Sequence, residues 1–256
     1  MSESSRATFK LCAVVPVYNH EEAIGTVVAQ LLNHQLPCIL VDDGSNARCA
    51  AVLDQLATQP KVSLVRREVN GGKGAAVMSG FEEAWRQGYS HVLQIDADGQ
   101  HDVADVPRFI EHAQGNPGSV INGEPRFDES VPKVRFYGRY LTHVWVWINT
   151  LSTAIGDTMC GFRIYPLATV VELTENVNLG KRMDFDTEIL VRLSWRGVDV
   201  LPLKTAVSYP LDGVSHFDLW RDNVAISAMH ARLFVGMLIR LPMLLGRKLL
   251  GRKCYS

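Results

Sequence analysis

The sequence predicts an α/β fold in which a mostly parallel sheet is flanked by helices. Short, apolar, β-branched runs that end in polar or glycine-containing turns predict strands at residues 11–15, 39–41, 62–65, 92–95 and 120–121. Between them, at 21–33 and 75–86, apolar residues recur at helical spacing. Strands that alternate with helices of this length form βαβ units, which bind ligands at the carboxyl ends of the strands. Functional residues are therefore expected in the loops that follow the strands.

Beyond about residue 124 this alternation weakens. Helical patterns and then strand patterns are expected at 135–153, 184–196, 198–203 and 206–209. A last helix is expected from about residue 218, kinked by Pro242. We interpret 11–216 as one domain, with a nucleotide-binding half at 11–123 and an acceptor half at 124–216. The flanking segments are a flexible lead-in at 1–10 and a basic amphipathic helix at 217–256.

Composition excludes several classes of protein. Lys and Arg total 26 against 27 Asp and Glu, so the overall charge gives no reason to expect a nucleic acid partner. The hydrophobic content of 47% is enough for a sizeable core, which excludes a mainly disordered chain. Five scattered cysteines without zinc-site spacing favour reduced thiols and a cytoplasmic location. The polar N-terminus does not have the pattern of a signal peptide, and we expect no membrane-spanning helix.

Two carboxylates, Asp96 and Asp98, flank Ala97 directly after the fourth expected strand. In a loop that turns both side chains inward, they can hold one hard divalent cation that also bridges a diphosphate. Such a pair is common by chance, and the alternative is a solvated turn. The position after an apolar strand favours the metal site.

The loops after the first two strands carry groups that suit a nucleotide. Asp42 and Asp43 can accept hydrogen bonds from a base or a ribose hydroxyl, although an ordinary Asp-Gly turn is the alternative. Pro16 and Tyr18 present a flat face on which a base could stack, and the alternative is a loop closed by Glu21 at the next helix.

A glycine-rich loop at 70–74 lies between the third strand and the next helix. Gly72 lets the backbone approach a phosphate, and Lys73 adds a positive charge. A Walker A loop would require Ser or Thr where Gly74 stands, and a dinucleotide fingerprint would follow the first strand. Neither motif fits this loop.

Taken in order, these loops resemble the successive signatures of family-two glycosyltransferases with the GT-A fold, which is Rossmann-like. The motifs are Val-Val-Pro-Val-Tyr-Asn, Val-Asp-Asp-Gly-Ser, Asn-Gly-Gly-Lys-Gly, Asp-Ala-Asp-Gly-Gln-His and Cys-Gly-Phe-Arg, at 14–19, 41–45, 70–74, 96–101 and 160–163. The resemblance covers roughly residues 11–216. It is strongest to the subgroup of dolichol-phosphate mannose synthase and related bacterial enzymes.

The resemblance implies a role for each matched residue. Those that would hold the nucleotide-sugar, a UDP- or GDP-sugar, are Pro16, Tyr18, Glu21, Asp42, Asp43, Gly72, Lys73, Asp96 and Ala97. Mg²⁺ or Mn²⁺ would be bound by Asp96, Asp98 and Gln100. Residues near the donor sugar or the acceptor, or with a catalytic role, would be Asp157, Arg163, Asp186 and Glu188. The last two could instead be an acidic helix start favoured by the helix dipole.

The implied reaction is a single displacement with inversion. Asp186 is our candidate for a general base if the acceptor is a hydroxyl, whereas a phosphate acceptor needs no strong base. The resemblance also implies a lipid or lipid-linked acceptor. Glu124 stands where polyprenyl-phosphate enzymes tend to have a Ser-Arg pair, so Arg126 would take over the acceptor phosphate, or the acceptor would be a different lipid hydroxyl.

The C-terminal helix is basic. Six of the 26 basic residues follow Asp222 and none of the acidic ones does. Arg232, Arg240 and Arg247 fall within about 80° of one another on a helix, opposite much of the apolar content. This predicts either peripheral association of 218–253 with the anionic cytoplasmic leaflet or a helix packed on the domain with a solvated basic face.

Two other function classes remain open. A sugar-1-phosphate nucleotidyltransferase would show a glycine-rich loop soon after the first strand, and residues 16–22 contain none. A nucleotide-sugar-binding module without transferase activity is the other alternative, and only an assay separates it from an enzyme.

Overall fold

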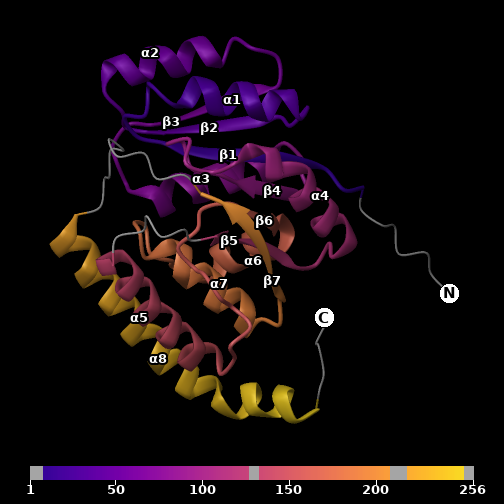
Figure 1. Ribbon diagram of the computed structural model, residues 1–256, viewed down its shortest axis with the longest axis vertical. Coiled ribbons are helices and arrows are strands. Elements are labelled where there is room, and N and C mark those ends of the chain that lie inside the picture. Colours follow the sequence, from indigo (N-terminus) through magenta and orange to yellow (C-terminus); the bar gives the residue numbers. More distant parts are fainter. Residues whose placement is uncertain (1–7, 127–132, 208–217, 251–256) are drawn as a thin grey trace.

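The fold is a seven-stranded sheet between two layers of helices (Figure 1). The computed structural model describes residues 8–126, 133–207 and 218–250. The strands are β1 Leu11–Val17, β2 Cys38–Asp43, β3 Val62–Arg67, β4 His91–Gln94, β5 Val120–Arg126, β6 Arg163–Pro166 and β7 Val200–Ala206. The helices are α1 Ile24–Asn33, α2 Ala47–Leu56, α3 Lys73–Arg86, the short 3-10 helix η1 Val103–Asp105, α4 Val106–Gly115, α5 Lys133–Thr150, α6 Leu167–Asn176, α7 Phe185–Trp195 and α8 Leu219–Leu250.

The strand order is β3-β2-β1-β4-β6-β5-β7, and β6 alone runs antiparallel to its neighbours. The chain moves outward from β1 to β3 and then returns to place β4 on the other side of β1. This reversal is a topological switch point, where the loops of a parallel sheet diverge and leave room for a ligand. The predicted α/β class with a mostly parallel sheet is therefore confirmed.

Alternation along the strands builds two cores. In β1, Cys12 and Val14 point to one face, and Ala13, Val15 and Val17 point to the other, all nearly fully buried. The first face packs against α3, α6 and α7, and the second against α1, α2 and α4. Strands that are covered on both faces contain continuous apolar runs, which is the pattern the sequence displays.

Several elements differ from the sequence-based expectation. The helices α2, α4 and α6 and the strand β6 were not predicted. The helix expected from residue 21 begins at Ile24, because residues 21–23 form a turn. The strand expected at 206–209 is wrong where it is described: β7 ends at Ala206, and Val207 makes only an isolated bridge with His101. Residues 208 and 209 lie outside the described residues.

The C-terminal helix α8 packs beside α5 and α7, on the side of the sheet away from α1 and α2 (Figure 1). It continues through Pro242, and Figure 1 shows its axis changing direction toward the C-terminal end. By length and composition it could span a membrane, a test that core helices of soluble proteins also pass, and only 22% of its most apolar window is buried. Our expectation of no membrane-spanning helix therefore stays a prediction.

Candidate active site

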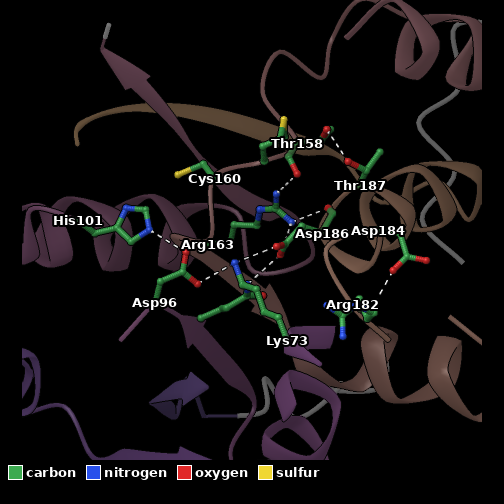
Figure 2. A network of polar contacts seen from close by, with 12 residues as sticks. Lys73, Asp96, His101, Thr158, Cys160, Arg163, Arg182, Asp184, Asp186 and Thr187 are labelled. Carbon is green, nitrogen blue, oxygen red and sulfur yellow. Dashed lines mark hydrogen bonds and ion pairs between the residues drawn. The ribbon is translucent and has the colours of Figure 1, made fainter. Parts of the chain in front are cut away.

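The site is centred on Lys73, the first residue of α3 (Figure 2). Its Nζ lies 2.8 Å from Oδ1 of Asp96, in the loop after β4, and 2.9 Å from Oδ2 of Asp186, in the first turn of α7. His101 Nε2 approaches the other Asp96 oxygen at 3.4 Å. Three segments that are distant in the sequence therefore place their charges at one point beyond the carboxyl end of β4.

Mutual attraction keeps Lys73 and Asp96 charged. Burial alone would lower the pKa of Lys73, but the charges of Asp186 and Asp96 outweigh it and raise this pKa above its ordinary value. Burial alone would raise the pKa of Asp96, but the nearby Lys73 and His101 outweigh it and lower this pKa well below its ordinary value. The site is therefore an ion-paired cluster over a wide range of pH.

A second layer fixes Asp186 from behind. Gln94, the last residue of β4, donates from Nε2 to Asp186 Oδ1 at 3.0 Å. Arg163 is fully buried and donates to the carbonyl oxygens of Asp186 at 2.7 Å and Thr158 at 2.6 Å. The hydroxyls of Thr158 and Thr187 share a hydrogen bond of 2.9 Å. Arg163 thus lies beneath the site, where it positions α7.

Sequence reasoning missed Gln94, Thr158, His101 and Thr187. Gln94 could have been found, because it is a polar residue at the end of a strand in which every position is buried. A buried amide normally has a hydrogen-bond partner, which points to a polar cluster nearby. The partner itself, 92 residues further along the chain, has no signal in the sequence.

Asp157 organises the turn before β6. Its Oδ1 accepts from the backbone N–H groups of Met159 and Cys160, both at 2.8 Å, while Oδ2 lies 3.2 Å from Arg139 Nε and 3.7 Å from His143 Nε2 on α5. Burial alone would raise the pKa of Asp157, but the contacts with His143 and Arg139 outweigh it and lower this pKa. Asp157 therefore ties α5 to the loop that precedes the Cys-Gly-Phe-Arg motif.

Glu188 is separated from the cluster, although it is only two residues from Asp186. It is fully buried, and its Oε2 accepts from the backbone N–H of Gly180 at 2.8 Å. Its Oε1 lies 2.7 Å from Arg192 Nη2, and its Oε2 lies 3.2 Å from Arg232 Nη2. The structure thus places Glu188 at the junction of α7 and α8.

The loops after β2 and β3 are joined by Asp43. Its carboxylate accepts from the backbone N–H groups of Gly71 at 3.0 Å and Gly72 at 2.8 Å, and from Arg67 Nε at 2.7 Å. Gly72 has a φ of +97°, and a Cβ built there would lie 2.6 Å from the carbonyl oxygen of Lys181. Asp43 thus shapes the glycine-rich loop that presents Lys73.

The other expected nucleotide-binding residues line the same edge. Asp42 accepts from the backbone N–H of Ser45 at 2.9 Å and from Arg66 Nε at 3.0 Å. Pro16 lies opposite Val41 in the sheet, and Tyr18 is half-buried in the loop that follows β1. Glu21 lies 3.9 Å from Arg48 at the start of α1. All of these residues lie at or just beyond the carboxyl ends of β1 and β2, where βαβ topology places ligand-binding groups.

The side chains around Asp96 provide some, but not all, of the ligands that a metal ion needs. Asp98 Oδ1 accepts from the backbone N–H of Gln100 at 3.0 Å, which holds the two residues in one turn. The buried side chain of Ala97 points away, into the core. Across the described residues, no three His, Cys, Asp or Glu side chains form a ready metal cluster. Two carboxylates fit a Mg²⁺ or Mn²⁺ ion whose other ligands are water and diphosphate.

The expected acceptor residue Arg126 lies at the end of β5 and is exposed. Close by, Glu124 Oε2 forms an ion pair of 2.7 Å with Lys204 Nζ on β7. The charge of Glu124 is therefore balanced by a partner that the sequence did not reveal. Residues 127–132, which follow Arg126, lie outside the described residues.

Comparison with known proteins places this geometry in a family. The profile described as Glycosyl transferase family 2 matches residues 12–169. The polyprenol monophosphomannose synthase of Mycolicibacterium smegmatis is 26% identical over 210 residues, which cover 76% of this chain and 74% of that protein. The UDP-N-acetylglucosamine–dolichyl-phosphate N-acetylglucosaminyltransferase of Methanococcus voltae is 24% identical, over 75% of this chain and 84% of that protein.

Solved structures show the same fold. Glucosyl-3-phosphoglycerate synthase from Mycobacterium tuberculosis, in complex with Mn²⁺ and UDP-glucose, superposes with a TM-score of 0.61 at 17% identity. The match covers 91% of this chain and 79% of that one. A second crystal structure of the same enzyme superposes with a TM-score of 0.62.

Proposed function

This chain belongs to glycosyl transferase family 2, and on that premise we propose that it transfers a sugar from a nucleoside-diphosphate sugar to the phosphate of a lipid carrier. The observation that carries the proposal is the contact of Lys73 with both Asp96 and Asp186. This cluster lies at the switch point of the sheet, where the diphosphate of a donor would enter. The names of two relatives, which refer to polyprenol and dolichyl phosphate, support this acceptor class.

The surroundings of Asp186 favour an acceptor that needs no base. Its Oδ2 is paired with Lys73, and its Oδ1 accepts from Gln94 and lies 3.6 Å from Arg163 Nη1. A carboxylate held by two cations and an amide gives up these interactions if it takes a proton. A phosphate acceptor is already an anion at neutral pH and can attack without a general base. Asp186 then acts as the fixed counter-ion of Lys73.

In the proposed reaction, a phosphate oxygen of the acceptor forms a bond to the anomeric carbon as the bond to the donor diphosphate breaks. The configuration inverts, and the nucleoside diphosphate leaves. Lys73 stabilises the negative charge that develops on the leaving group. Mg²⁺ or Mn²⁺, when bound by Asp96, Asp98 and Gln100, would neutralise the same diphosphate. The residues at the carboxyl ends of β1 and β2 would hold the nucleoside.

Glu124 is compatible with a phosphate acceptor, because its ion pair with Lys204 removes the repulsion that an isolated carboxylate would cause. Arg126 lies two residues further along β5 and is exposed. An exposed guanidinium can bind a phosphate with two parallel hydrogen bonds. We therefore propose Arg126 as the first contact of the acceptor phosphate.

We also propose that α8 places the enzyme on a membrane surface, with an orientation that differs from the sequence-based expectation. Two of the three arginines of the basic face point inward: Arg240 stacks 4.8 Å from the ring of Trp195, and Arg247 Nη1 donates to the carbonyl oxygen of Trp195 at 2.6 Å. The outward face is apolar and includes Trp220, Val235, Leu238, Ile239 and Leu249. Apolar burial rather than surface charge would then drive binding. We propose that this is the cytoplasmic surface of the membrane, in keeping with the free thiols of Cys12, Cys38, Cys49 and Cys160.

The test is a transfer assay with two matched acceptors. Purified protein with Mn²⁺ is given radiolabelled UDP- and GDP-sugars together with either a polyprenyl phosphate or the corresponding polyprenol. We expect labelled lipid with the phosphate only. Transfer to the alcohol would overturn the acceptor class, and a lack of both transfer and nucleoside diphosphate release with every donor would favour a binding module without transferase activity.

A further inference from the structure

The loop that carries Lys73 rests on the segment between α6 and α7. The backbone N–H of Ala75 donates to the carbonyl oxygen of Lys181 at 3.0 Å. A Cβ built on Gly74 would lie 2.8 Å from the carbonyl oxygen of Gly180, so the two backbones touch where Gly74 follows Lys73. The position of the Lys73 ammonium therefore depends on the position of residues 180–182.

Two buried carboxylates hold that segment from the opposite side. Glu188 accepts from the backbone N–H of Gly180 at 2.8 Å, and Asp222 accepts from Arg182 Nε at 2.7 Å. Both carboxylate side chains are completely buried. Asp222 belongs to α8, and Arg232, one further α8 residue, lies 3.2 Å from Glu188. The helix α8 thus contacts the segment directly through Asp222 and indirectly through Arg232.

We propose that Glu188, Arg232 and Asp222 are positioning residues for the donor: they fix residues 180–182 and thereby set Lys73 at the distance from Asp96 and Asp186 that a diphosphate requires. This tie is stiff because Glu188 and Asp222 are completely buried, and moving either carboxylate away from its arginine partners would lose charge pairing in a low dielectric. The inference rests on the proposed function, in which Lys73 faces the donor diphosphate.

The helix α8 thereby has a role in the donor site, although it lies beyond residue 169, where the match to the family profile ends. It also gives Glu188 a different role from the catalytic one that the sequence implied. Glu188 acts on the site through Gly180 and does not touch a substrate.

The test uses the full chain and compares the affinity for UDP and for GDP in the presence of Mn²⁺ by titration calorimetry. Arg232→Gln removes one charge from Glu188 at a half-exposed guanidinium, so the fold should survive. We expect its dissociation constant for the nucleoside diphosphate to rise about fivefold to twentyfold, within the usual range of couplings between sites. Arg232→Lys should restore most of the affinity. Arg221→Gln, an exposed arginine of the same helix, is the matched control and should bind as the wild type does.

A double-mutant cycle separates positioning from a merely structural role. If Arg232 acts through Glu188, Arg232→Gln should weaken binding much less in a Glu188→Gln background than in the wild type. Melting temperatures are recorded for every variant, and Asp222→Asn gives a second route if Glu188→Gln does not fold. A wild-type protein that binds neither UDP nor GDP would refute the proposed function. A wild type that binds, with Arg232→Gln and Asp222→Asn binding equally well, would refute only the positioning role.

Discussion

The edge of the sheet beyond β1 to β4 and the junction of α7 with α8 use the same residue types for different purposes. At the edge, the two acids flanking Ala97, Asp96 and Asp98, remain partly accessible, and the Asp96 side chain is 23% exposed. At the junction, Glu188 and Asp222 have no exposed side-chain surface, and each is paired with arginine. Accessibility therefore separates acids that can meet a ligand from acids that hold the structure together.

The contrast is sharpest within α7. Asp186 and Glu188 are both in its first turn, and a helix turns by about 200° over two residues. Asp186 consequently faces Lys73, and Glu188 faces Gly180 and α8. The two acids of this motif therefore belong to different regions, Asp186 to the edge of the sheet and Glu188 to the junction of α7 with α8.

The largest expected effect on sugar transfer comes from a substitution at the edge of the sheet. Asp98→Asn should lower transfer at least ~1000-fold, because it removes one of the two carboxylates available to a divalent ion at the leaving diphosphate. Asp102→Asn is the control, since Asp102 only caps η1, and an asparagine caps equally well. Transfer is measured against Mn²⁺ concentration. If Asp98→Asn transferred as fast as the control, the edge would have no metal-binding role.

Removing the central cation should have the next largest effect. Lys73→Met should lower transfer about 100-fold and destabilise the fold by about 3 kcal/mol, since the buried Asp186 and the partly buried Asp96 lose their shared partner. Thermal unfolding should show a dependence on pH. In the wild type, the lowered pKa of Asp96 keeps its stabilisation present above about pH 4, to be lost only at still lower pH. The raised pKa of Lys73 likewise preserves the pair until strongly alkaline pH.

In Lys73→Met, protonation of one carboxylate relieves the repulsion between the two. The difference in melting temperature from the wild type should therefore be largest near pH 8 and shrink toward pH 5. Lys181→Met, which removes the side chain of a nearby lysine, serves as the control. A difference that stayed constant over this range would contradict the ion-paired cluster.

The two regions also differ in how far the sequence reveals them. Asp42, Lys73 and Asp96 could be placed at one edge because each follows an apolar strand, and parallel strands end at the same edge. The pairing of Lys73 with Asp186 could not be predicted, because it depends on how α7 packs against the sheet. The inward face of α8 was missed for a similar reason: Arg240 and Arg247 are exposed in an isolated helix and find Trp195 only through tertiary packing.

Asp186→Asn tests whether this carboxylate is a base or a counter-ion. If Asp186 is a counter-ion, the substitution should lower the rate of transfer only about tenfold, since Lys73 keeps Asp96 as its partner. The loss of a general base typically lowers the rate 100-fold to 10,000-fold. The pH profile of transfer to a lipid phosphate is compared between Asp186→Asn and the wild type, with Glu175→Gln, at an exposed acid near the end of α6, as the control. If the acidic limb of the profile were lost in Asp186→Asn and kept in the control, Asp186 would be a general base.

The smallest catalytic effect is expected on the outer face of α8. Ile239 is 73% exposed, and Ile239→Glu places a charge among the exposed apolar residues of α8. Binding to phosphatidylglycerol vesicles should fall at least tenfold, since burying a charge in the interface is unfavourable. Nucleoside diphosphate affinity should be unchanged, because Ile239 lies two helical turns, about 10 Å, beyond Arg232 and its side chain is 73% exposed. Gln59→Glu, with the same charge change on the turn before β3, should bind vesicles as the wild type does. Because Arg240 and Arg247 face inward, raising the salt concentration should release little wild-type protein. Release by salt with no effect of Ile239→Glu would mean that the basic residues bind the membrane after all.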